Sequence, residues 1–100
     1  MKQSEMEYIA ARVSAAMQKQ GLLGKYKGEK ALFCICCVAA GAERAGEPWC
    51  ATGLAQEYGT YIGSAQIAVL QSIERATRRA NLRCSVGEII DHIVGEVVDK

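Results

Sequence analysis

The sequence has few aromatic residues and almost no proline: it holds a single phenylalanine, a single tryptophan and a single proline. The core must therefore be built from aliphatic side chains, alanine, methionine and cysteine, which suit close packing of helix against helix. Alternation of apolar and polar residues with period two is not sustained anywhere, so little or no sheet is expected. Because half of the 100 residues are hydrophobic, we expect one compact all-α domain spanning residues 1–100.

The chain also lacks a strong net charge and a long apolar run. The formal net charge is +1, so binding of nucleic acid would have to depend on local charge. No segment reaches the roughly 18 apolar residues that span a bilayer. Residues 1–7 are polar and unlike the start of a secretory leader. A cytoplasmic location with no membrane partner is the expectation.

The five cysteines do not have the spacing of a metal site. An odd number fits reduced thiols better than a disulfide framework. Cys34, Cys36 and Cys37 lie inside an apolar segment and would point in different directions on a helix, whereas zinc sites use paired C-x2-C spacings. We therefore expect buried structural cysteines, no metal and no cofactor.

Catalysis has weak support in the sequence. His92 is the only histidine, and Glu88 or Glu96 could pair with it on the same helix face. No phosphate-binding loop, nucleophile elbow or dinucleotide-binding glycine pattern is present. The sequence predicts a protein that is not an enzyme, with a metal-dependent enzyme as a remote alternative.

Apolar residues at helical spacing predict five helices, over residues 4–20, 29–40, 48–58, 64–81 and 86–98. Their expected ends are capping boxes at Ser4–Glu7 and Ser85–Glu88, an N-cap at Ser64, a first-position proline at Pro48, and stops at Gly21, Gly41 and Gly59. The second helix is apolar nearly all round, which predicts a central, buried position. Met6 and Met17 are expected in the core. Trp49 and Tyr58 are expected to close it, with Tyr61 exposed.

The third and fourth helices are expected to form a helix-turn-helix over residues 48–81. Ala55 is small enough for a close helix crossing, and Gly59 would supply a positive φ in the turn. Residues 74–83 contain four arginines and one acid. On the fourth helix the polar side chains gather opposite the apolar ones, and they are Gln71, Arg75, Arg78 and Arg79. Arginine contacts phosphates or reads guanine, and glutamine reads adenine.

The alternative interpretation of this arginine stripe is a solvated helix face, because arginine near a helix C-terminus also favours the helix dipole. Lys25, Lys27 and Lys30 form a second small basic cluster, which would either add phosphate contacts or remain solvated.

Four stretches resemble the C-terminal effector domain of the sporulation-initiation master regulator (stage-zero sporulation protein A) family. They are GLLGKYKG (21–28) with Leu32, LAQEYGT (54–60), IERATRRA (73–80) and SVGEIIDHIV (85–94). The resemblance implies an all-helical domain that regulates transcription through a helix-turn-helix and has no enzymatic activity. It places Glu74, Arg75, Arg78 and Arg79 at polar positions of the recognition-helix signature. A register shifted by four residues, which uses Val69 and Ile73 as the apolar pair, fits almost as well.

The function expected from the sequence is therefore sequence-specific binding of double-stranded DNA by a non-catalytic regulator. The predicted DNA-contacting residues are Ser64, Gln71, Glu74, Arg75, Arg78 and Arg79. A homodimer or tandem copies on DNA are the possible assemblies. The alternative function is a small protein-binding adaptor or inhibitor that reuses the same helical fold.

Overall fold

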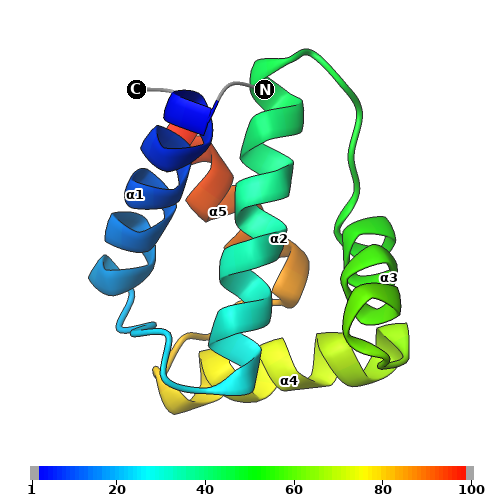
Figure 1. Ribbon diagram of the computed structural model, residues 1–100. Coiled ribbons are helices and arrows are strands. Elements are labelled where there is room, and N and C mark those ends of the chain that lie inside the picture. The colour runs from blue at the N-terminus through cyan, green and yellow to red at the C-terminus, as the bar shows by residue number, and fades with distance from the viewer. Residues whose placement is uncertain (1–2, 99–100) are drawn as a thin grey trace.

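The computed structural model describes residues 3–98 and folds them into five helices. These are α1 (Gln3–Lys19), α2 (Lys27–Arg44), α3 (Ala51–Ile62), α4 (Gln66–Arg79) and α5 (Val86–Val98). The described range contains no strand, so the all-α prediction is confirmed. Central α2 contacts the other four helices: α1 and α3 flank it, α5 lies behind it and α4 crosses its N-terminal end (Figure 1). Within residues 3–98, no helix combines the length and apolarity needed to cross a membrane.

The core forms where the apolar stripes of all five helices meet around α2. On α2 the buried side chains include Leu32, Ile35, Cys36 and Ala39, as the periodicity predicts. On α5 they include Ile89, Ile90, Ile93 and Val97. Met17 is buried in α1, while Trp49 and Tyr58 pack against the core from its edge. These residues form one core cluster around α2.

The prediction of a fully buried second helix is wrong for one face. Cys34 and Val38 are exposed there, and Phe33 and Cys37 are only half-buried. Met6, predicted to be in the core, is 56% exposed on the neighbouring helix. The reason is architectural, because α1 and α3 lie on either side of α2 and no element covers the face between them (Figure 1).

The predicted start of α1 and the predicted end of α2 are also wrong. α1 already includes Gln3, so Ser4 lies inside the helix rather than capping it, and the Gln3 side chain donates to Glu7. α2 continues through Gly41, which is buried in the core, to Arg44. The chain leaves this helix through Gly46, whose φ is +72°. A glycine in a packed helix can serve close approach rather than termination.

The third helix begins later than predicted, at Ala51, and Pro48 precedes it. Cys50 is the N-cap, and its sulfur accepts a hydrogen bond from the Gly53 amide at 3.4 Å. Cys50 is exposed. Of the three clustered cysteines predicted to be buried, Cys36 is buried and Cys37 is half-buried, whereas Cys34 is exposed, so the prediction is wrong for Cys34. At the other end of the chain, α5 has the predicted bounds, and the Ser85–Glu88 capping box is confirmed by hydrogen bonds of 2.8 and 3.1 Å.

The turn between α3 and α4 uses a different glycine from the one predicted. Gly59 is helical, and a Cβ built on it would lie 2.4 Å from the carbonyl oxygen of Ser64. Gly63 has the positive φ, +75°, and the Ser64 amide donates to the Gly59 carbonyl at 2.7 Å. Gly59 therefore lets the chain fold back closely over the end of α3, and Gly63 makes the turn. Ala65, not Ser64, is the N-cap of α4.

Candidate nucleic-acid interface

α4 presents a polar, cationic face to solvent. Its buried residues are Val69, Ile73, Ala76 and Thr77. Its exposed residues include Gln71, Glu74, Arg75, Arg78 and Arg79, so the predicted outward stripe is confirmed as a geometric feature. The buried Thr77 hydroxyl donates to the carbonyl of Glu74 at 2.7 Å, which satisfies it within the helix. The apolar stripe therefore fixes which way the arginines point.

A close helix crossing fixes the position of α4 against α2. Gly28, in the first turn of α2, is buried, and a Cβ built on it would lie 2.0 Å from the carbonyl oxygen of Ser72. Only a glycine permits this approach of two backbones. The crossing places the lysines at the start of α2 next to the middle of α4.

A small hollow marks the place where these two helices meet α3. It has a volume of about 160 Å³, and the residues that line it include Lys27, Tyr58, Ser64, Gln71 and Arg75. Three of the predicted DNA-contacting residues are thus gathered with a lysine from a distant segment. Ser64 is half-buried in the turn, whereas Gln71 and Arg75 are exposed.

The three arginines of α4 have different surroundings. Arg78 forms an exposed ion pair with Glu74 at 2.5 Å, one helical turn away. The Arg79 guanidinium lies over the ring of Tyr26, 4.1 Å from its centroid. Arg75 has no hydrogen-bond or ion-pair partner within residues 3–98. An exposed i,i+4 ion pair contributes only about 0.3–0.5 kcal/mol, so Glu74 does not hold Arg78 strongly.

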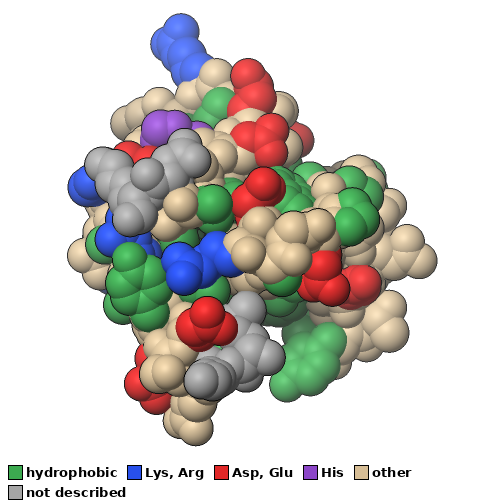
Figure 2. All heavy atoms as spheres, turned by 90° about the horizontal axis from the view of Figure 1, so that it is seen from above, with side chains coloured by type: hydrophobic (Ala, Val, Ile, Leu, Met, Phe, Trp, Pro, Cys, Tyr) green, Lys and Arg blue, Asp and Glu red, His purple; other side chains and the backbone are tan. Residues whose placement is uncertain are grey.

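Most of the basic residues of the molecule are concentrated at one end. Seven of the twelve lysines and arginines lie in residues 25–30 and 75–83, at the end of the molecule that carries α4. The opposite end, seen in Figure 2, displays carboxylates together with Lys or Arg side chains and apolar side chains. The net charge of +1 therefore conceals a local cationic surface on and around α4.

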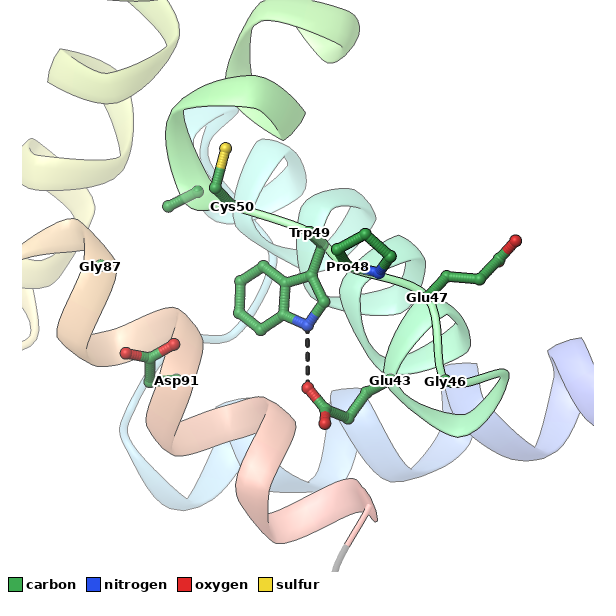
Figure 3. A pocket seen from close by; sticks show the side chains of 9 residues that line it. Glu43, Gly46, Glu47, Pro48, Trp49, Cys50, Gly87 and Asp91 are labelled. Atoms are coloured by element: carbon green, nitrogen blue, oxygen red, sulfur yellow. Dashed lines mark hydrogen bonds between the residues drawn. The ribbon is translucent and has the colours of Figure 1, made fainter.

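A second hollow lies at this opposite, more acidic end and has a volume of about 630 Å³. Trp49 lies in it between Glu43 of α2 and Asp91 of α5, and the indole nitrogen donates to a Glu43 oxygen at 2.9 Å (Figure 3). The tryptophan anchors the connection between α2 and α3 against the core. With three carboxylates around it, this hollow is unsuited to a polyanion.

The thiols and the histidine do not form a catalytic arrangement in the described residues. Burial raises the pKa of the Cys36 and Cys34 thiols, and it raises the pKa of Cys37 to about 11, with a smaller effect from Cys34. Thiols with raised pKa values are poor nucleophiles at neutral pH. The predicted pairing of His92 with Glu88 or Glu96 is wrong, because its ring contacts the Gln20 side chain at 3.1 Å. Within residues 3–98, no group of three or more acidic, histidine or cysteine side chains is placed to hold a metal.

Sequence reasoning missed several features of this surface. The aromatic platform that Tyr26 provides for Arg79 depends on a contact between distant segments. Ile67 is 61% exposed at the start of α4, next to the polar stripe, although its residue type predicts burial. The one sequence signal for the crossing at Gly28 is a glycine inside a basic segment that precedes an apolar helix.

In comparisons with known proteins, the chain matches no family model, no curated protein and no solved structure.

Proposed function

We propose that this protein binds double-stranded DNA, with α4 in the major groove and the start of α2 against the adjacent phosphates. The observation that carries the proposal is the orientation of α4, whose apolar stripe faces the core while Gln71, Arg75 and Arg78 point outward. A 14-residue helix is about 21 Å long, and the major groove is about 12 Å wide and accepts a helix. The preceding helix α3 and the turn through Gly63 support α4 as the two-helix unit requires.

The surroundings of each side chain support distinct roles. Arg75 and Gln71 lie together at the hollow between α2, α3 and α4, exposed and central on the helix, which suits contacts to base edges. Arg78 and Arg79 lie in the last turn, where they would contact phosphates. Arg78 would exchange Glu74 for a phosphate, since the ion pair is exposed. Ser64 would contribute a hydrogen bond at the start of the helix.

The two basic segments act together in this proposal. Lys27 lines the same hollow as Arg75, and Lys25 and Lys30 lie within three residues of it along the chain. Phosphate contacts of this kind position a protein on DNA and provide most of the salt-dependent affinity. The resemblance of residues 21–94 to the sporulation-regulator effector domain supports the same function, with transcriptional regulation as its biological output.

The test is a fluorescence-polarisation titration with duplexes selected from a random pool, at two salt concentrations. Arg75→Ala should weaken binding by about 5-fold or more, which corresponds to at least about 1 kcal/mol, and should relax the preference at one base position. Lys27→Ala should weaken binding to all sequences and reduce the salt slope by about 1.

The matched control is Ala15→Glu, which changes the net charge by the same one unit as Arg75→Ala. Ala15 is exposed on α1 and does not line the hollow beside α4, so this variant should keep near wild-type affinity. Equal affinity of Arg75→Ala and Ala15→Glu, with helicity intact in both, would reject α4 as the binding surface. An affinity that does not fall with salt would reject the DNA proposal as a whole.

A further inference from the structure

The side of α2 that no helix covers forms a continuous apolar surface. We define this α2 face by six residues: Met6, Phe33, Cys34, Cys37, Val38 and Tyr61. Val38 is 54% exposed and Tyr61 is 87% exposed. Open hollows of about 790 Å³ between α1 and α2 and about 260 Å³ between α2 and α3 lie along this surface and share Cys34 and Val38. Contiguous exposed apolar patches often mark sites of protein–protein contact.

The charges on the rim of the α2 face indicate what the partner is. Glu5, Arg44 and Glu47 line the hollow between α1 and α2. Glu5 is in the first turn of α1, Arg44 is the last residue of α2 and Glu47 follows it, so all three belong to the end of the molecule opposite α4 (Figure 1). None of them forms an ion pair within residues 3–98, and the Arg44 guanidinium lies over the ring of Tyr8, 5.5 Å from its centroid. A two-fold rotation about an axis parallel to α2 does not change the position of a residue along α2. Acidic and basic side chains at one level of the surface therefore face the same level of a second copy, where an acid of one copy can meet a base of the other.

We propose that the α2 face binds the same face of a second copy of this chain, in a two-fold dimer whose axis runs parallel to α2. Each residue then meets the partner at its own level, as an isologous interface requires. Val38 packs near Val38 of the partner subunit, and Arg44 lies level with the partner's Glu5 and Glu47, twice per dimer. The interface does not involve α4, so the proposal stands independently of the DNA proposal.

Sedimentation equilibrium of the purified chain, without DNA, tests the dimer. The wild type should show reversible association to a dimer. Val38→Glu should weaken association by at least about 10-fold, equivalent to about 1.4 kcal/mol, because it places a carboxylate in the apolar contact. The fold should survive, since Val38 is exposed and glutamate is a better helix former than valine. Circular dichroism checks this.

Ala15→Glu is the matched control, because it introduces the same charge at an exposed helical position outside the two hollows of the α2 face. It should dimerise like the wild type. If Ala15→Glu weakens the dimer as much as Val38→Glu, the α2 face is not the interface. A wild type that stays monomeric at all concentrations also overturns the proposal, including the case in which the face binds a different protein.

A charge exchange tests the direction of the two-fold axis. Arg44→Glu should weaken the dimer, and the double variant Arg44→Glu/Glu47→Arg should recover it, because acid and base still lie level with each other across a parallel axis. A double variant no better than Arg44→Glu would overturn the parallel arrangement. Loss of the dimer with retained DNA binding, or the reverse, separates failure of this proposal from failure of the proposed function.

Discussion

The crossing of α2 and α4 at Gly28 gives the sharpest test of how the sequence positions the candidate interface. In Gly28→Ala, the new methyl group would lie 2.0 Å from the Ser72 carbonyl oxygen and 2.5 Å from its carbon. Ordinary contact is about 3.5 Å, so the two helices must separate by more than about 1 Å. Backbone cannot rotate away as a side chain can. We therefore place the cost at the upper end of the overpacking range, about 3 kcal/mol.

An opposing gain must be subtracted from this cost. Alanine is favoured over glycine in a helix interior by about 1 kcal/mol, which leaves a net destabilisation of about 2 kcal/mol. For a domain of this size that is a fall in Tm of about 8–16 °C, measurable by thermal unfolding followed by circular dichroism. The same displacement would move α4 away from Lys27.

Gly95→Ala is the control for this prediction. Gly95 is in α5, and a Cβ built on it meets no atom within 4 Å. It should therefore raise the free energy of unfolding by up to about 1 kcal/mol through helix propensity alone. If Gly28→Ala is as stable as the wild type, or is stabilised as Gly95→Ala is expected to be, the close crossing is not present and the account of how α4 is held is wrong.

Three further predictions concern other elements. Gly59→Ala should destabilise the turn between α3 and α4, because its Cβ would meet the Ser64 carbonyl at 2.4 Å; a urea midpoint equal to that of the wild type would contradict this. Hydrogen bonds to the backbone and the side chain of Ser85 lower the pKa of Glu88 in the folded state. The Glu88 carboxylate therefore stabilises the fold above its unfolded pKa, and this contribution is lost as the pH falls through the lower folded pKa. The free energy of unfolding of Glu88→Gln should accordingly fall less than that of the wild type between neutral and acid pH, as measured by urea titrations at the two pH values. In thiol labelling of the folded protein, exposed Cys50 should react first and buried Cys36 only on unfolding, and early modification of Cys36, identified by peptide mass, would contradict its burial.

The helices and most of the core were predictable because they follow from local patterns. Two features of α5 show this: the buried stripe of Ile89, Ile90, Ile93 and Val97, and the capping box between Ser85 and Glu88. Both depend only on residues that are close together in the sequence. The outward placement of Gln71 and Arg75 on α4 followed from the same periodicity.

What the sequence did not predict depends on how helices meet. Gly41 and Gly59 were expected to end helices, but both lie inside them, one in the core and one beneath a returning chain. Sequence alone does not distinguish a glycine kept for its positive φ from one kept for its lack of a side chain. The exposure of Met6 and Val38 has the same origin, since apolar periodicity identifies a face that prefers burial but not the element that would cover it.

The two proposals use different parts of one helix, and their geometry is compatible. The N-terminal turn of α2 abuts α4 through Gly28, while the uncovered side of α2 runs along the rest of its length from Cys34 toward Arg44. A two-fold axis parallel to α2 keeps both copies of α4 at the same end of the dimer, with their outward faces directed to the same side. Such a dimer would bind a palindromic duplex with two half-sites, as paired helix-turn-helix units do. The monomeric variant Val38→Glu should then bind a single half-site like the wild type but lose the added affinity of the second. Equal loss on single and double half-sites would show that α2 affects α4 directly, and that the dimer plays no part in DNA binding.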